Sequence, residues 1–139
     1  MSERVHLLPG SQIPAWVKTL EQETFGEPWG SLEGHEHLFG LPPSAYARWS
    51  VVPAAQEAEL LRIAVSPAAR RQGFARRLLE DSERFLAGQG IGTLYLEVRD
   101  SNLPAQALYA SMGWRLQRLR KAYYRNGEDA RIYWKQLGA

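Results

Sequence analysis

The sequence of 139 residues contains no cysteine, and this absence excludes several kinds of chemistry at once. Without cysteine the chain can form no disulfide bond, no thiolate metal site and no cysteine nucleophile. No apolar run approaches the roughly 20 residues that a membrane-spanning helix needs. The N-terminus also lacks the apolar core of a signal peptide. We therefore expect a cytoplasmic protein with no membrane contact.

The common nucleotide-binding and metal-binding patterns are absent as well. There is no GxxxxGK[ST] loop and no GxGxxG motif after a strand, which excludes the Walker A and Rossmann fingerprints. The run His35-Glu36-His37 has only His6 to join it as a further histidine, so we interpret it as the start of a strand. We expect no metal cofactor.

The composition is that of an ordinary globular protein. Hydrophobic residues make up 45% and charged residues 23%, and the length suits a single domain over residues 1–139. The net charge of +2 is mildly basic. A nucleic-acid partner and an anionic cofactor account for this charge equally well.

Hydrophobic periodicity predicts both strands and helices. The predicted strands are residues 5–8, 38–41, 46–52, 58–65, 93–98, 114–119 and 130–137. The predicted helices are residues 14–25, 72–86 and 102–112, the last capped by Asn102, and Ser31 is expected to cap a further short turn. A strand–helix–strand crossover requires a parallel strand pair. The sequence therefore predicts an α/β domain of three layers with a mixed sheet.

The stretch from Leu61 to Arg76 joins a strand to a helix through a short basic loop. Pro67 ends the strand because it has no N–H to donate. Gly73 and Ala75 let another group approach the backbone closely. The N–H groups and the dipole at the start of a helix favour negative charge, and the arginines of the loop add positive charge. The loop predicts a phosphate-binding site; the alternative is an ordinary turn with a solvated basic face.

Glu97 stands in the middle of a predicted strand, on the face opposite Leu94 and Leu96. A carboxylate in a covered region is costly unless it is paired, hydrated or used in chemistry. The spacing leaves two interpretations open: a catalytic carboxylate, or a salt bridge with an arginine such as Arg62.

The pattern Arg70-x-x-Gly73-x-Ala75 resembles the acetyl-CoA signature of the GCN5-related N-acetyltransferases, the GNAT superfamily. Two longer runs make the resemblance more specific. LEVRxSN, which contains Glu97, and ALYxxxGW, which contains Tyr109, are similar to segments of the RimI-type branch, the ribosomal-protein alanine N-acetyltransferases. The likeness extends to EQETFGEPW at residues 21–29, RKAYY at 120–124 and GEDA at 127–130, and is weakest over residues 34–57.

The resemblance implies a GNAT-like three-layer α/β/α fold with a splayed mixed sheet, and acetyl-CoA as cosubstrate. It implies Glu97 as general base and Tyr109 as general acid, although the residues alone are also consistent with Tyr109 as a core tyrosine. Arg62 departs from the family, which often has a small polar residue there, and this bears on how the acceptor peptide lies beside the strand. The implied cofactor contacts are Ile63, Ala64, Val65, Arg70, Arg71, Gln72, Gly73, Phe74, Ala75, Arg76 and Asn102.

The chemistry of amine acetylation agrees with these implied roles. An α-amine with its pKa near ~8 is mostly protonated at neutral pH, so a base must take its proton before it attacks. A tyrosine hydroxyl can donate to the leaving thiolate, and backbone N–H groups near Val65 can stabilise the oxyanion.

The resemblance implies acetylation of a protein N-terminal α-amine, specifically the alanine of a small-subunit ribosomal protein. Because the sequence has no aromatic-basic RNA motif, we expect no direct binding of nucleic acid. The alternatives are a GNAT enzyme for a small amine or a protein lysine, a non-catalytic acetyl-CoA-binding module, and a basic RNA-binding module.

Overall fold

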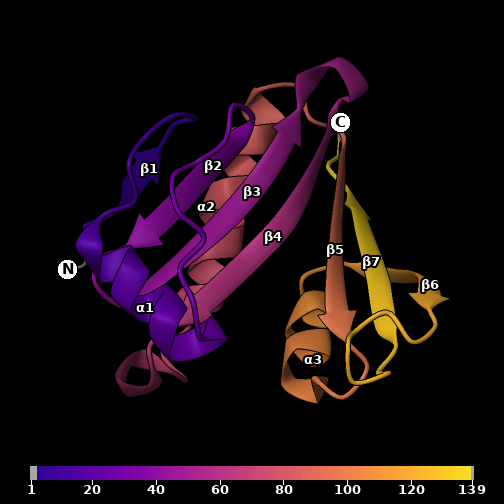
Figure 1. Ribbon diagram of the computed structural model, residues 1–139. Helices are drawn as coiled ribbons and strands as arrows, with labels where there is room; N and C mark the ends of the chain where they lie inside the picture. The colour runs from indigo at the N-terminus through magenta and orange to yellow at the C-terminus, as the bar shows by residue number, and fades with distance from the viewer. Residues whose placement is uncertain (1–2, 139) are drawn as a thin grey trace.

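The computed structural model describes residues 3–138, which form one seven-stranded sheet with helices on both faces (Figure 1). The strands are β1 (Val5–Leu7), β2 (Glu36–Leu41), β3 (Ala45–Val52), β4 (Glu57–Val65), β5 (Thr93–Arg99), β6 (Arg115–Arg120) and β7 (Ala130–Gln136). The helices are α1 (Ala15–Phe25), α2 (Phe74–Gly88) and α3 (Leu103–Ser111). The prediction of a single domain over residues 1–139 extends beyond the described part and stays a prediction.

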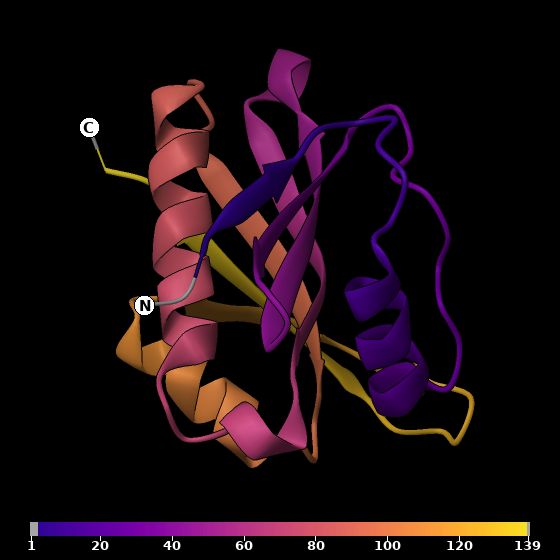
Figure 2. The ribbon, with the colours of Figure 1, turned by 90° about the vertical axis from the view of Figure 1, so that its left-hand side faces the viewer.

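The strand order is β1-β2-β3-β4-β5-β7-β6, and β4 and β5 form the parallel pair that makes the sheet mixed. Helix α1 covers one face of the sheet, whereas α2 and α3 lie on the other face (Figure 2). The predicted three-layer α/β architecture is therefore confirmed. The turn expected at Ser31 was wrong: residues 31–33 are not helical, and the Ser31 carbonyl instead accepts a hydrogen bond from Arg48 at 3.0 Å.

Two groups of buried side chains hold the layers together. On the α2 side, Leu79 and Leu86 pack with strand residues that include Trp49 and Leu94. On the α1 side the packed residues are Ile13, Val17, Leu20, Leu32, Leu38, Tyr46 and Ala64. Full burial of one such leucine contributes about 1.5–3 kcal/mol. No helix within residues 3–138 is both long and apolar enough to cross a bilayer.

A β-bulge in β4 changes which face its side chains occupy. Arg48 of β3 pairs with Arg62, and the next residue, Trp49, pairs with Leu60, so Leu61 is an extra residue without a partner. Because side chains alternate along a strand, the extra residue exchanges the two faces. Leu60 packs on the α2 side, and beyond the bulge Arg62 lies on the α1 side.

The bulge coincides with the place where β4 leaves β5. Their parallel pairing covers Glu57–Leu60 against Thr93–Leu96 and then ends. β5 continues beside β7 as far as Arg99, so the sheet splays open between β4 and β5 (Figure 1). The expectation of a splayed sheet is thereby confirmed.

Gly40 lies directly beneath the ring of Trp16 from α1. A Cβ atom at this position would come within 2.8 Å of the ring. We expect Gly40→Ala to lower the free energy of unfolding by about 1–3 kcal/mol because it overpacks the α1–sheet contact. Urea unfolding measures the effect, with Gly34→Ala as a matched control, since a Cβ at Gly34 meets no atom within 4 Å. Equal midpoints for the two variants would contradict this packing.

Candidate active site

The loop between β4 and α2 has backbone conformations suited to close contact with a ligand. Arg71 and Gly73 both have positive φ, at 65° and 78°. Gly73 is the N-cap of α2 and has no side chain to cap the first N–H groups of the helix. These N–H groups therefore remain available for an anion, and the dipole of α2 favours one there.

This loop borders a cavity of about 450 Å³, which we call the loop cavity. Ala64 and Gln72 do not line it: Ala64 is buried on the α1 side, and the Gln72 amide donates to the Ala68 carbonyl at 3.3 Å. The other predicted cofactor residues line it together, namely Ile63, Val65, Arg70, Arg71, Gly73, Phe74, Ala75, Arg76 and Asn102.

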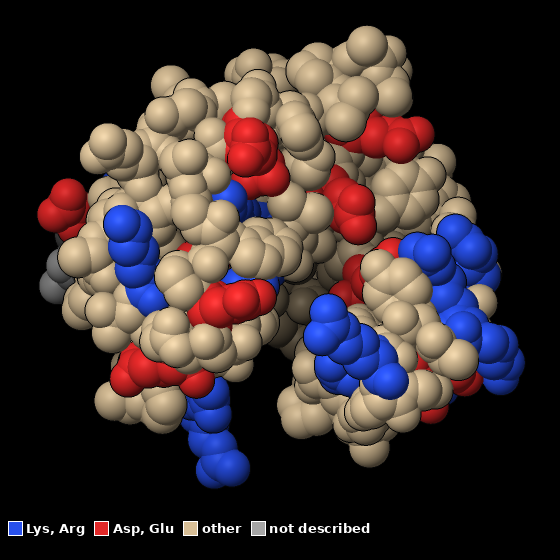
Figure 3. All heavy atoms as spheres, viewed as in Figure 1, with Lys and Arg blue, Asp and Glu red and all other residues tan. Residues whose placement is uncertain are grey.

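A second cavity of about 330 Å³ opens where β4 and β5 separate, and we call it the splay cavity. Three of its residues, Ile63, Asn102 and Tyr109, also line the loop cavity. The two cavities therefore adjoin at these side chains. Figure 3 shows the molecular surface hollowed between the two halves of the sheet. The splay cavity is lined by Phe25, Leu60, Leu61, Arg62, Ile63, Glu97, Val98, Arg99, Asn102, Tyr109 and Tyr124.

Glu97 lines the splay cavity and is also paired. Its Oε1 atom lies 3.0 Å from Nη1 of Arg120, and 22% of its side chain is exposed. A hydrogen bond to this carboxylate raises the pKa of the Tyr123 hydroxyl. The suggested salt bridge with Arg62 was wrong, because Arg62 pairs with Glu21 instead, at 3.7 Å. The salt-bridge interpretation of Glu97 therefore holds with Arg120 as the partner, and a catalytic role of this carboxylate stays a prediction.

Tyr109 lies at the junction of the two cavities. It is 5% exposed, and its ring contacts those of Trp114 and Tyr133. Burial raises the pKa of its hydroxyl to about 12. Tyr109 is therefore a core tyrosine whose O–H stays protonated at neutral pH and can act as a donor.

Asn102 and the turn between β6 and β7 close the other side of the splay cavity. The Asn102 Oδ1 atom accepts from the Ala105 N–H at 3.2 Å, which confirms the predicted cap of α3. Glu128 in the turn accepts from the Ser101 N–H at 2.6 Å and from Arg99 at 3.1 Å. The Arg99 guanidinium in turn lies 3.9 Å from the centre of the Tyr124 ring. These contacts fix Tyr124 at the cavity wall.

The run His35-Glu36-His37 lies at the start of β2, as expected, and His37 contacts His6 of the neighbouring strand. His6 Nε2 and His37 Nδ1 lie 2.9 Å apart across β1 and β2. Within residues 3–138, no three His, Cys, Asp or Glu side chains come together as a metal site would require.

The sequence profile described as the Acetyltransferase (GNAT) family matches residues 11–114. The chain belongs to the GNAT acetyltransferase family. It is accordingly an acyltransferase, and GNAT acetyltransferases use acetyl-CoA. The resemblance read from the loop and from the LEVRxSN and ALYxxxGW runs is confirmed.

Individual acetyltransferases show how far the similarity extends. A protein of Escherichia coli K12 named [ribosomal protein bS18]-alanine N-acetyltransferase is 40% identical over 127 residues, covering 84% of each chain. The Salmonella typhimurium LT2 protein of the same name is 36% identical over 141 residues, covering 92% of this chain and 93% of its own. The crystal structure of the E. coli ribosomal-protein-S18-alanine N-acetyltransferase superposes with a TM-score of 0.78 at 30% identity, covering 99% of this chain and 96% of the other.

Sequence reasoning missed several residues that line the two cavities. Pro104, Ala105 and Leu108 of α3 line the loop cavity, and their spacing places them on one helical face. The helical spacing of these three residues is visible in the sequence and could have predicted this face. Phe25 also lines the splay cavity; the sequence predicts correctly that the helix ends at this residue, but no local pattern indicates that this end lies beside a cavity.

Proposed function

We propose that this GNAT enzyme transfers the acetyl group of acetyl-CoA to the N-terminal α-amine of a protein that begins with alanine, namely ribosomal protein bS18. One observation carries the proposal: Tyr109 joins the loop cavity to a second cavity that contains Glu97. The names of relatives 36% and 40% identical over most of the chain support the acceptor. A cytoplasmic location follows from that acceptor.

The loop cavity fits the elongated, anionic CoA molecule. The N-terminal N–H groups of α2 and the arginines of the loop suit the pyrophosphate. Beyond Leu60, β4 has lost its partner β5, so one backbone edge of Ile63–Val65 is open to the amides of the pantetheine arm. Asn102 borders the same cavity.

The splay cavity would then receive the acceptor amine. In the proposed reaction, the ammonium gives a proton to the Glu97 carboxylate, directly or through a water molecule. The nitrogen lone pair attacks the thioester carbonyl, and the tetrahedral intermediate collapses as the C–S bond breaks. The leaving thiolate takes the proton of the Tyr109 hydroxyl. The nitrogen gives up its second proton as the amide forms, which restores the Tyr109 hydroxyl through water, and Glu97 releases its proton to solvent. No covalent enzyme intermediate forms, in agreement with a chain that has no cysteine.

An α-amine suits this site better than a lysine. The pKa of an α-amine is ~2 units lower than that of lysine, so a single carboxylate base suffices at neutral pH. A non-catalytic acetyl-CoA-binding module is less well supported, because such a module needs neither a carboxylate nor a hydroxyl donor at the end of the cofactor cavity.

Gly73→Val is expected to weaken CoA binding more than Arg71→Ala does. Valine disfavours the φ of 78° at this position, and its side chain would crowd the pyrophosphate. Arg71→Ala removes a charge but leaves the backbone N–H groups in place. Calorimetric titration with CoA compares the two variants. Equal or reversed losses would show that the loop backbone does not bind the pyrophosphate.

Glu97→Gln and Tyr109→Phe should differ in their pH dependence. Glu97→Gln should lower kcat/KM most near neutral pH and recover partly at higher pH, because the amine then loses its proton without help. Tyr109→Phe should lower kcat while CoA affinity stays nearly unchanged, because the hydroxyl acts on the leaving thiolate. Steady-state kinetics across pH test both. A deficit for Glu97→Gln that is constant with pH would assign this carboxylate a positioning role.

Three synthetic peptides test the proposed acceptor. One begins with alanine, one is the same peptide with a blocked N-terminus and an internal lysine, and one begins with tryptophan. We expect efficient acetylation of the alanine peptide alone, measured as CoA release and by mass spectrometry. Equal rates on the alanine peptide and the blocked lysine peptide would refute an N-terminal acceptor and favour a lysine acetyltransferase.

A further inference from the structure

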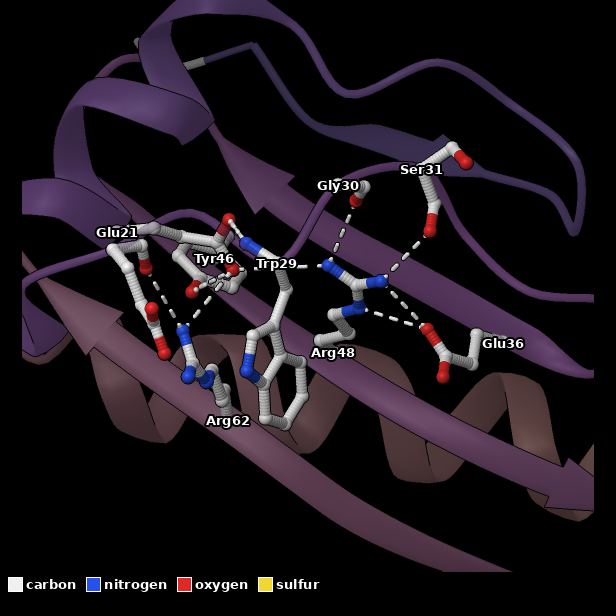
Figure 4. A network of polar contacts seen from close by, with 9 residues as sticks. Glu21, Trp29, Gly30, Ser31, Glu36, Tyr46, Arg48 and Arg62 are labelled. Carbon is white, nitrogen blue, oxygen red and sulfur yellow. Dashed lines mark hydrogen bonds and ion pairs between the residues drawn. The ribbon is translucent and has the colours of Figure 1, made fainter.

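Arg62 forms part of the wall of the splay cavity, and its guanidinium is fixed from several directions (Figure 4). The Cζ atom lies 3.6 Å from the centre of the Trp29 ring and 4.3 Å from that of Phe25. Nη1 donates to the Glu27 carbonyl at 3.4 Å. Only 11% of the side chain is exposed. The guanidinium is therefore a rigid surface rather than a mobile surface charge.

Glu21 anchors this arrangement from inside the protein. It is fully buried, and its Oε2 atom lies 3.7 Å from both Arg62 and Arg48. The same oxygen accepts from the Tyr46 hydroxyl at 2.8 Å, and Oε1 accepts from the Trp29 N–H at 3.1 Å. Burial and the Glu21 carboxylate raise the pKa of Tyr46 well above its usual value, so Tyr46 remains a donor. Moving Arg62 would leave a buried carboxylate less compensated, which is costly.

The position of Arg62 relates this rigid wall to the reacting groups. Arg62 directly follows the bulge residue Leu61 and lines the splay cavity from the α1 side of the sheet. Glu97 and Tyr109 line the same cavity. Because Glu21 balances the charge of Arg62, this side chain repels an incoming ammonium group only weakly. Its effect on the acceptor is mainly steric. An acceptor with its amine at Glu97 therefore brings its first side chain toward the rigid guanidinium of Arg62, which has no room to move aside.

We propose that Arg62 is a specificity-determining residue that limits the size of the acceptor's first side chain. This inference rests on the proposed N-terminal acceptor and goes beyond it, because it names the residue in this chain that selects a small first residue. Arg62 lies outside the loop cavity, so its effect is confined to the acceptor and leaves CoA binding unchanged.

Arg48 offers a matched control from the same network. It contacts Glu36 at 2.8 Å, donates to the carbonyls of Gly30 and Ser31, and lies 5.2 Å from the centre of the Trp29 ring. It does not line the splay cavity. A variant of Arg48 therefore disturbs the segment after α1 without enlarging the cavity.

The test measures kcat/KM for two peptides that differ only in a first residue of alanine or leucine. Arg62→Ala and Arg62→Gln should lower the alanine-to-leucine preference about tenfold or more, because a single methylene group in an apolar pocket changes kcat/KM by roughly 10–200-fold. Arg48→Gln should keep the wild-type preference. The Kd for CoA should stay unchanged in the Arg62 variants.

Two results would overturn the inference: an unchanged preference in the Arg62 variants, or an equal shift in Arg48→Gln. The double variant Glu21→Gln, Arg62→Ala removes the uncompensated carboxylate and provides the same measurement if Arg62→Ala folds poorly. A wild-type enzyme that is inert toward the alanine peptide would instead refute the proposed function, and the inference with it.

Discussion

The separation of β4 from β5 is the constraint on which the rest of the structure depends. Backbone hydrogen bonds would normally hold a central parallel pair closed, but here they end at Leu60 and Leu96. The two halves of the sheet then need another connection. On the face that carries α2, Lys135 of β7 contacts the buried Glu83 of α2 at 2.6 Å and donates to the Met112 carbonyl at the end of α3 at 2.6 Å. This cluster joins α2 to α3 and β7 beside the part of the sheet where β4 and β5 are still paired, because Lys135 lies opposite Leu94.

The buried polar network on the α1 side meets a second need created by the opening. Glu21, Glu36, Arg48 and Arg62 bring two carboxylates and two guanidinium groups into the interior, where each unpaired charge would be costly. Their contacts join α1 and the chain after it to β3 and β4. Apolar packing alone would allow this irregular segment several positions, whereas directional contacts specify one. These contacts fix the part of the splay-cavity wall that contains Phe25 and Arg62.

The sequence predicted the parts of this structure that depend on local periodicity. The stripe of α2, the alternation around Glu97 and the cap at Asn102 each follow from a few neighbouring residues, and each is present. The partners of charged residues were not predictable in this way. Arg62 and Glu97 do line one cavity, as their suggested pairing required, but α1 supplies Glu21 to the first and β6 supplies Arg120 to the second. Tertiary packing alone determines those choices. The prediction of a helical turn at Ser31 was wrong for the same reason. The Ser31 carbonyl accepts a hydrogen bond from Arg48, which is distant in the sequence, and no helical turn forms there.

Pairing of the arginines around the splay cavity bears on the proposed role of Glu97 as a base, because Glu97 is itself in an ion pair. Arg62, Arg99 and Arg120 each have a carboxylate partner, and each lies over an aromatic ring. Glu21 and Glu128 therefore balance the charges of Arg62 and Arg99 toward an ammonium group, whereas Arg120 is balanced by Glu97 itself. Arg120 engages Oε1 of Glu97, whereas a carboxylate has lone pairs on both oxygens. The ion pair therefore orients the carboxylate and leaves it capacity to accept a further proton donor.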